Sequence, residues 1–392
     1  SADLADTISV TGDGDNTVFG NLGADEITVT GEGNNTVYGG QDADDITVTG
    51  GVAASISTVF GNEGADTITV TSAGDVTVFG GNGNVDAAAD ADTINVTLTG
   101  DEASATIFGN AGADDINILG EAGGEYQVYG GAGDDVIAGL TTPADEDVPA
   151  TTASALIGDG SEIFGNEGAD TIDVTLTGEG ASATIYGGNG NVDATADVDT
   201  ITVATVEGQD VTIFGNGGAD VIEFTGEGDV TVFGGLGNDQ ITFGGSNFTV
   251  TGGEGEDNFI SDVGAVDDEV EADEVGFIND VNFDLDTFDF GTTVDTAFNL
   301  TGFVPREAET AGFAAIEEAD TLGEAADAAI DFLFDAGLAD TGDDAAVVFT
   351  YNGESYLAVD AFGGAEGTID GLVRITGFTG TLSTDDFVGA PL

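Results

Sequence analysis

An aromatic residue followed by glycine returns ten times along the first part of this chain, most often after a step of 19 residues. A small acidic loop and an apolar run follow each return, as in Phe19-Gly20-Asn21-Leu22-Gly23-Ala24-Asp25-Glu26-Ile27. Self-similarity at a fixed short period predicts a solenoid, because each repeat can bury its apolar side only against its neighbours. The aromatic residues are Phe19, Tyr38, Phe60, Phe79, Phe108, Tyr129, Phe164, Tyr186, Phe214 and Phe233.

The nine residues after each aromatic residue follow the pattern G-G-x-G-x-D-x-U-x, in which U is a large aliphatic residue. Residues 130–138 and 234–242 match it at every defined position. Residues 61–69 have Asn62 at the second position, where a residue that tolerates left-handed backbone angles is needed. A weaker nonapeptide separates successive strong ones. Two nonapeptides and one spacer residue therefore make up the 19-residue step.

These nonapeptides resemble the calcium-binding repeats of the repeats-in-toxin (RTX) family, over roughly residues 1–262. Nine or ten copies in register at a constant period make the resemblance specific. It implies a right-handed parallel β-roll, in which each coil has two short strands joined by two glycine-rich turns. The expected fold is therefore an all-β solenoid over residues 1–262, followed by a smaller α+β domain over residues 263–392.

The pattern of apolar residues agrees with such coils. Ile27 and Val29 alternate with polar residues, which is strand periodicity with one buried side. The turns carry Gly, Ala, Asn and Asp, so an apolar core cannot stabilise them and a hard cation is needed. Calcium takes six to eight oxygen ligands from carboxylates and backbone carbonyls. We expect about ten or more calcium ions, held by Asp25, Asp44, Asp66, Asp86, Asp90, Asp92, Asp114, Asp134, Asp170, Asp193, Asp197, Asp199, Asp220, Asp239 and Asp257.

The two edges of the predicted solenoid differ in their carboxylates. Because a weak nonapeptide separates the strong ones, the predicted aspartate ligands of the strong turns should line a single edge. The opposite edge has Asn16, Asn35, Val76 and Val230 at the matching position, and we expect it to bind fewer ions or none. The alternative is that neighbouring carboxylates substitute and both edges bind calcium; these are Asp15, Asp75 and Asp229.

The array is itself duplicated, since residues 60–116 align with residues 164–222. Each copy has an extended loop with three aspartates at D-x-x-x-D-x-D spacing, namely Asp86, Asp90 and Asp92, then Asp193, Asp197 and Asp199. These loops are either surface insertions or additional calcium loops, and the spacing favours calcium. Between the copies, residues 139–162 contain two prolines and lose the pattern, which predicts an excursion from the solenoid.

Composition limits the possible functions. The chain has 76 acidic residues, two basic residues and a formal charge of −74. This charge should keep the calcium-free chain expanded and argues against a nucleic acid partner. The chain has no His, Cys, Lys, Met or Trp, which removes most catalytic machinery, so we expect no enzyme. A glycan lyase or hydrolase that uses carboxylates alone is the least favoured function.

Targeting signals are few. Residues 1–20 lack a basic start and an apolar stretch, so the sequence predicts no Sec-type signal peptide. No apolar run reaches the 18 residues or so of a membrane span. The absence of cysteine fits an exported bacterial protein that needs no disulfides. Because the chain begins at Ser1 inside a repeat, we expect either a processed N-terminus or a fragment.

A second domain is predicted to begin near Asp262, where the glycine period stops. We expect short strands within residues 275–290, helices within residues 307–337 that end at Gly323 and Gly337, and a last strand over residues 372–378. Residues 347–360 predict a hairpin that turns at Asn352-Gly353.

This second segment resembles the C-terminal domain of RTX proteins that type I secretion exports. The matching features are the F-T-Y-N-G-x-S-Y-L-x-V-D hairpin, the R-I-T-G-F strand, and Asp385, Asp386 and Phe387 near the end. The resemblance implies an uncleaved C-terminal secretion signal and a bacterial extracellular or cell-surface protein. Such a chain would stay unfolded in the calcium-poor cytosol and fold on meeting calcium outside.

The array makes up most of the chain, which favours a structural function. We expect a secreted protein that self-assembles into a surface layer, a filament or a matrix. The alternative is an adhesin or matrix fragment whose binding domain lies outside these residues, and cell-surface polysaccharide is a candidate partner. The ten aromatic residues should form a stacked outer stripe. That stripe either shields the glycine turns of its own solenoid or packs against another subunit.

Overall fold

The computed structural model describes residues 4–81, 90–100, 102–118, 124–139, 141–142, 151–152, 154–188, 197–245, 247–261, 266–267, 275–290, 296–301, 310–336, 344–360, 368–369 and 371–387. The chain divides into two compact units, Ser1–Gly218 and Ala219–Leu392. Both are described below, each by itself. The predicted domain boundary at residue 262 stays a prediction.

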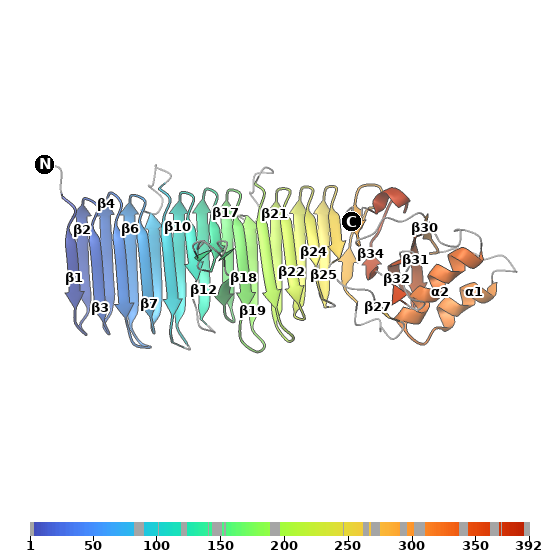
Figure 1. Ribbon diagram of the computed structural model, residues 1–392, viewed down its shortest axis with the longest axis horizontal. Helices are drawn as coiled ribbons and strands as arrows, with labels where there is room; N and C mark the ends of the chain where they lie inside the picture. Colours follow the sequence, from blue (N-terminus) through green and yellow to red (C-terminus); the bar gives the residue numbers. More distant parts are fainter. Residues whose placement is uncertain are drawn as a thin grey trace. The chain divides into compact units, whose positions relative to one another are not determined.

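Residues 1–218 form a parallel β-solenoid whose coils each contribute one strand to each of two sheets (Figure 1). The first sheet contains β1 (Thr7–Thr11), β3 (Glu26–Gly31), β5 (Asp45–Gly50), β7 (Thr67–Ser72), β9 (Thr93–Leu98), β11 (Asp115–Ile118), β13 (Val136–Ala138), β18 (Thr171–Leu176) and β20 (Thr200–Thr205). The second sheet contains β2 (Asn16–Leu22), β4 (Asn35–Gln41), β6 (Ile56–Glu63), β8 (Asp75–Gly81), β10 (Ser104–Ala111), β12 (Glu125–Ala132), β17 (Ser161–Glu167), β19 (Ser182–Gly188) and β21 (Asp210–Gly217).

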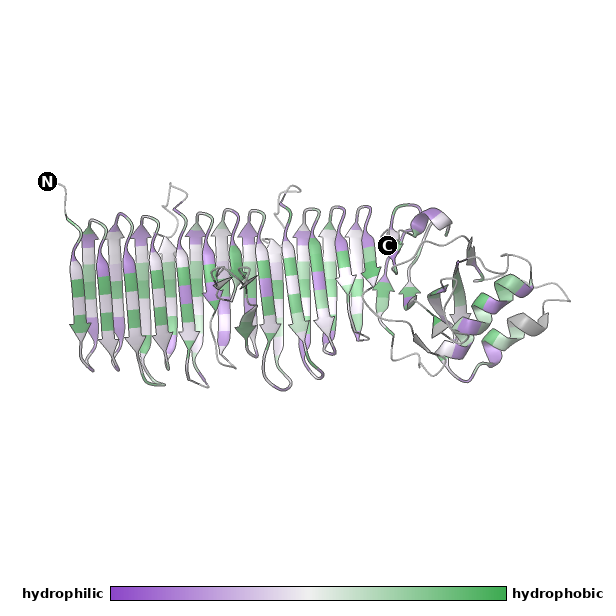
Figure 2. Cartoon of the chain, viewed as in Figure 1, coloured by the Kyte–Doolittle hydropathy of each residue, from purple (hydrophilic) through white to green (hydrophobic). Residues whose placement is uncertain are grey.

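The core of this solenoid is two facing columns of β-branched side chains. In the first sheet Ile27 pairs with Ile8 and Ile46, and in the second sheet Val37 pairs with Val18 and Val59. The alternation of hydrophobic and hydrophilic residues along each strand is visible in Figure 2. Such residues pack well on a pleated surface with one buried face, which explains why this sequence forms strands.

The chain leaves the first sheet between β13 and β16 (Ala155–Ile157). Val136 of β13 pairs with Thr171 of β18, whereas Ala155 of β16 pairs with Val174 farther along the same strand. The two short segments together therefore occupy the place of one strand. Between them, β14 (Thr141–Thr142) and β15 (Thr151–Thr152) form an antiparallel pair of their own.

Residues 219–392 begin with coils of the same kind. Four strands form one sheet: β22 (Val221–Gly226), β24 (Gln240–Phe243), β26 (Asn258–Ser261) and β29 (Thr287–Asp289). Their neighbours in the other sheet are β23 (Asp229–Leu236), β25 (Phe248–Glu254) and β28 (Phe277–Asn279). Phenylalanines take some of the core positions here beside aliphatic residues such as Ile241. The rings of Phe243 and Phe248 lie 4.6 Å apart.

The sheet of β28 continues into a hairpin that two helices cover. The strands β34 (Gly371–Thr376), β32 (Glu354–Asp360), β31 (Ala345–Tyr351) and β30 (Thr296–Asn299) follow β28 in that order. The hairpin of β31 and β32 turns at Asn352 and Gly353, both with positive φ, as predicted. The remaining elements are α1 (Thr310–Glu318), α2 (Leu322–Asp335), the pair β27 (Val266–Asp267) and β33 (Thr368–Ile369), and the 3-10 helix η2 (Thr384–Asp386).

The helix α2 corrects one prediction. Gly323 was predicted to end a helix, but it lies in the first turn of α2. The hydroxyl oxygen of Thr321 accepts a hydrogen bond from Glu324 N at 3.2 Å and caps this helix. The other predicted helix end, Gly337, lies outside the described residues.

Candidate calcium-binding turns

One buried aspartate per coil lies where a second-sheet strand turns into the next first-sheet strand, and we name this side of the coils the aspartate edge. In residues 1–218 its aspartates are each at most 3% exposed. The backbone N–H of each donates to Oδ1 of the aspartate one coil later, at 2.7–2.8 Å. This ladder runs through Asp25, Asp44, Asp66, Asp92, Asp114, Asp135, Asp170 and Asp199.

Residues 219–392 contain a ladder of the same kind. The N–H of Asp220 donates to Asp239 at 2.9 Å, and the N–H of Asp239 donates to Asp257 at 3.0 Å. The ladder ends at Asp286, which accepts from Asp257 N at 3.1 Å and from Asn282 N at 2.7 Å. Asp286 was not predicted because it lies beyond the repeat. The signal for it is the D-x-N-x-D-x-D run of residues 280–286.

In residues 1–218 the second carboxylate oxygen of each ladder aspartate points at the glycine that follows the aromatic residue. A Cβ added to Gly61 would collide with Asp66 Oδ2 and with the carbonyl oxygen of Gly80 in the next coil. The same pair of oxygens surrounds Gly130, from Asp135 and Gly165. Only glycine therefore fits at this position, and its missing side chain leaves a cradle lined by oxygens.

Several of these buried carboxylate oxygens have no hydrogen-bond donor. This holds for Oδ2 of Asp25, Asp44, Asp66, Asp135 and Asp239. Residues 1–218 contain no Lys, Arg or His, so no basic side chain of this unit can pair with them. A buried, unpaired carboxylate is costly, and it must either take up a proton or bind a cation.

The pKa values of these groups reflect the same cost. Burial raises the pKa of Asp66 to about 8, although the hydrogen bond from Asp44 N opposes the rise. Burial likewise raises the pKa of Asp135 to about 8 and that of Asp257 to about 7. The charges of neighbouring aspartates add to each rise. A divalent cation in the cradle would favour the ionised form and reverse these shifts.

The chemistry of these oxygens fits calcium. Carboxylate and carbonyl oxygens are hard ligands, and calcium accepts both in flexible geometry. Asp66 and Asp135 would each supply a carboxylate oxygen, and the glycine carbonyls would supply the rest. Among the described residues, no three acidic side chains lie close enough together to hold a metal ion by themselves. Each ion would therefore depend on one or two carboxylates and on the backbone.

The structure places most of the predicted ligands on the aspartate edge and corrects one. Asp134 was predicted at the ladder position of its coil, but Asp134 is exposed and Asp135 occupies that position. The repeat pattern already favours Asp135, which is the sixth residue of the nonapeptide 130–138, and the pairing with Asp114 and Asp170 confirms it. Asp134 accepts a hydrogen bond from Ala169 N at 3.0 Å instead.

The extended loops are only partly described. Asp86 and Asp193 lie outside the described residues. Asp90 and Asp197 are half-buried, and Asp90 Oδ2 accepts a hydrogen bond from Gly64 N at 3.1 Å. Asp92 and Asp199 belong to the ladder. The prediction of additional calcium loops stays a prediction.

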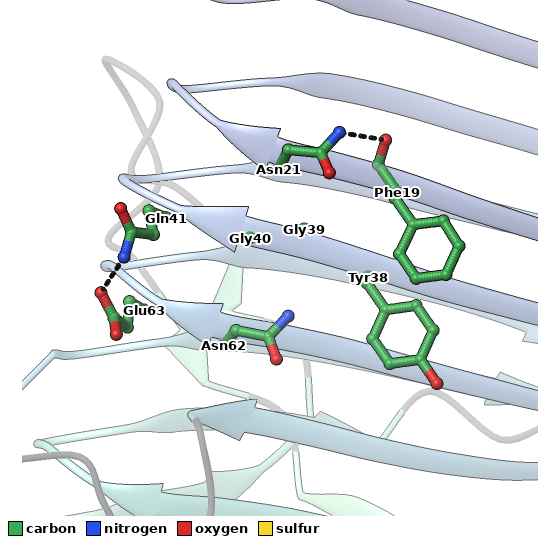
Figure 3. Close-up of a pocket in the computed structure, with 8 residues that line it drawn as sticks. All are labelled: Phe19, Asn21, Tyr38, Gly39, Gly40, Gln41, Asn62 and Glu63. Atoms are coloured by element: carbon green, nitrogen blue, oxygen red, sulfur yellow. Dashed lines mark hydrogen bonds between the residues drawn. The ribbon is translucent and has the colours of Figure 1, made fainter. Parts of the chain in front are cut away.

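The aromatic residues stack on the outer surface of the second sheet, as predicted. From Phe19 to Phe214, neighbouring ring centroids lie 4.6–4.9 Å apart, and the ring planes lie within 6° of parallel. Phe19, at the end of this column, is 54% exposed. Figure 3 shows Phe19 and Tyr38 in a shallow groove whose other lining residues are Asn21, Gly39, Gly40, Gln41, Asn62 and Glu63.

Comparison with known families agrees with the repeat pattern. The model of the RTX calcium-binding nonapeptide repeat matches residues 5–29, 29–52, 60–84, 127–141, 205–225 and 224–247. No curated protein and no solved structure matches the chain. Among the described helices, none is long and apolar enough to cross a membrane.

Proposed function

Because RTX calcium-binding nonapeptide repeats build the parallel β-solenoid of this chain, we propose that it is a secreted structural protein. In this proposal the chain folds on binding calcium outside the cell and self-assembles into a surface layer, filament or matrix. Its role is structural and not catalytic. RTX repeats are typical of extracellular calcium-binding proteins. The observation that carries the proposal is the ladder of buried aspartates in a unit without basic residues.

The ladder makes folding depend on a cation. Coils of parallel strands lie about 4.8 Å apart, so ionised ladder aspartates repel one another by about 3 kcal/mol per neighbouring pair at an effective dielectric constant of about 20. Eight such residues line one edge of the first unit. The thin apolar core of each coil has little free energy with which to offset this repulsion. Calcium would replace the repulsion with attraction at the turns of the aspartate edge.

Calcium titration of the chelated chain tests whether folding depends on calcium. Circular dichroism should show coil in chelator and strand after calcium is added, while magnesium at equal concentration should have a smaller effect. Magnesium demands near-octahedral geometry and gives up its water reluctantly. A chelated chain with full strand signal and unchanged melting temperature would contradict calcium-dependent folding.

Self-assembly requires a surface on which two strongly negative chains can meet. About ten calcium ions would offset only about twenty of the 74 negative charges. The middle of the outer surface of the second sheet in residues 1–218 is the exception to this charge. It consists of three outward columns, which we name the aromatic face: the aromatic stack, a column that runs from Thr17 to Thr212, and a column that runs from Asn21 to Asn216. A further outward column borders this face and contains Asp75, Glu125 and Asp210.

Glu162 is the only carboxylate in these three columns of described residues. Two copies of the chain can therefore bring these three columns together with few carboxylates between them, although Asp75 and Glu63 are among the carboxylates that border the columns. Threonine hydroxyls both donate and accept hydrogen bonds, so the same surface can pair with itself about a two-fold axis. These properties support a second copy of the chain as the partner of the aromatic face.

A triple substitution tests the aromatic face. Phe79, Phe108 and Phe214 are changed to Ser together, and assembly in calcium is followed by light scattering and electron microscopy. The matched control changes three exposed apolar residues outside the second sheet, Val52, Val136 and Val206, to Ser. We expect the first variant to fold and stay monomeric, and the control to assemble. If the first variant folds and assembles as the parent does, the aromatic face is not the interface.

Export by type I secretion is the remaining part of the proposal. It is supported by the hairpin of β31 and β32 and by β34, which lie where the sequence resembles the C-terminal domain of exported RTX proteins. The test is co-expression of the chain with a type I exporter, with and without residues 371–392. Secretion that does not depend on these residues would contradict this route.

A further inference from the structure

The two edges of the solenoid differ in the side chains that point inward. The opposite edge comprises the turns that lead from a first-sheet strand into the next second-sheet strand. Its inward column of residues contains no carboxylate in the described part of residues 1–218. In order along the solenoid, the column consists of Asn16, Asn35, Ser57, Val76, Ala105, Tyr126, Ser161, Ala183 and Val211.

Neutral side chains donate hydrogen bonds to the turn carbonyls of this opposite edge. Asn16 Nδ2 donates to Gly14 O at 2.7 Å, and Asn35 Nδ2 donates to Gly33 O at 3.1 Å. Farther along, Ser55 donates to Val52 O, Ser161 to Gly158 O and Gln209 to Gly178 O, each at 2.8 Å. Five turn oxygens of this edge are therefore already hydrogen-bonded to side chains of the protein.

The acidic residues at the opposite edge point to solvent and accept hydrogen bonds from the next coil. Asp15, Asp75 and Asp159 are exposed. Each accepts a hydrogen bond from the backbone of the following coil, from Asn34 N at 2.9 Å, Ser104 N at 3.1 Å and Ser182 N at 2.8 Å. These carboxylates join successive coils as hydrogen-bond acceptors, and water solvates their charge.

We propose that the solenoid binds calcium along the aspartate edge alone and that the opposite edge is held by its own Asn, Ser and Gln donors. This inference rests on the proposed calcium binding at the aspartate edge. Each coil would then take about one ion and not two, because only one of its turns combines an inward carboxylate with a nearby glycine carbonyl such as Gly80 O. The side-chain amides of Asn21 and Asn62 on that edge donate to the carbonyls of Phe19 and Phe60 instead. The solenoid would have one cation-dependent edge and one cation-independent edge.

A pair of charge-matched variants of the full chain tests the inference. Asp66→Asn removes an inward carboxylate on the aspartate edge, and Asp75→Asn removes an outward carboxylate on the opposite edge. Both remove one negative charge, and both keep an oxygen that can accept the existing hydrogen bond. Bound calcium is counted by equilibrium dialysis, and the calcium concentration at the folding midpoint is measured by circular dichroism.

We expect Asp66→Asn to lose about one bound calcium ion and to raise the folding midpoint several-fold, since one cradle loses its charged ligand. Asp75→Asn should bind as many ions as the parent. Equal losses in the two variants would overturn the inference. If the parent itself binds no calcium, the proposed function fails first, so the two failures are distinguishable.

A crystal structure of the unaltered protein in calcium provides a test that needs no variant. Anomalous scattering should locate one row of ions, beside Asp25, Asp44, Asp66 and the later ladder aspartates. A second row beside Asn16, Asn35 and Ser57 would overturn the proposal, even if both variants failed to fold.

Discussion

The coils of residues 1–218 and the helix-covered hairpin of residues 219–392 bury their apolar side chains in different ways. Most strands of the coils bury one or two β-branched aliphatic residues, and the turns bury an aspartate such as Asp66. The hairpin and helices instead form one cluster that includes Leu322, Phe332, Leu333 and Phe349. Among the described residues of α1, α2, β31 and β32, no carboxylate is buried. We therefore expect hydrophobic burial to hold the hairpin region alone, whereas we propose that the coils also need a cation.

The largest expected difference between the two regions follows calcium removal. In chelator, the amides of β5 and β7 should lose at least about 100-fold of their protection from hydrogen exchange, because the coils open. The amides of α2 and β31 should keep most of theirs. Exchange measured by mass spectrometry on peptides from both regions gives the comparison. Equal loss of protection in both regions would show that the coils depend on calcium no more than the hairpin region does.

Truncating one core side chain in each region tests whether only the coils depend on calcium. Leu333→Ala should destabilise the hairpin region by about 2–5 kcal/mol with or without calcium, since a fully buried side chain is lost. Ile68→Ala in the coils should cost a similar amount in calcium. In chelator the Ile68→Ala substitution should have no measurable effect, because we expect the coils to be unfolded already. Urea denaturation of both variants under both conditions provides the measurement.

Acid should affect the coils in opposite directions with and without calcium. The folded-state pKa values of Asp66 and Asp135 are raised from 3.8 to about 8. Between these values the folded coils bind more protons than the unfolded chain, so calcium-free stability rises as the pH falls. With calcium present, protons compete for the same oxygens and the calcium midpoint should increase. Circular dichroism from about pH 8 to about pH 5 tests both trends. A chelated chain that is equally unfolded from about pH 8 to about pH 5 would contradict the first trend, the gain in calcium-free stability.

The smallest expected effect lies in the hairpin region. Thr321→Ala removes the N-cap of α2 and should destabilise this region by about 1 kcal/mol, independently of calcium. Thr321→Ser keeps the hydroxyl and serves as the control. Thermal unfolding followed at helix wavelengths, in chelator, would detect the loss. A calcium-dependent effect of this substitution would mean that the two regions are not independent.

Much of the fold could be predicted because it repeats. Alternation in residues such as Ile27 and Val29 predicted the strands, and Asn352-Gly353 predicted the hairpin turn. The helix boundary at Gly323 was predicted wrongly, since a glycine near the start of a helix gives the same local signal as one at its end. The cap at Thr321 and the burial of Leu322 decided the boundary.

The sequence by itself determined the period, the buried face of each strand, the acidic turns and the outward aromatic column, because each of these depends on residues a few positions apart. Tertiary structure decided which oxygens come together. The hydrogen bond from Asp114 N to Asp135 and the carbonyl oxygen of Gly80 beside Gly61 both depend on contacts between successive coils. Those contacts join residues 19 to 35 positions apart, and coils of unequal length bring them into register only when they stack.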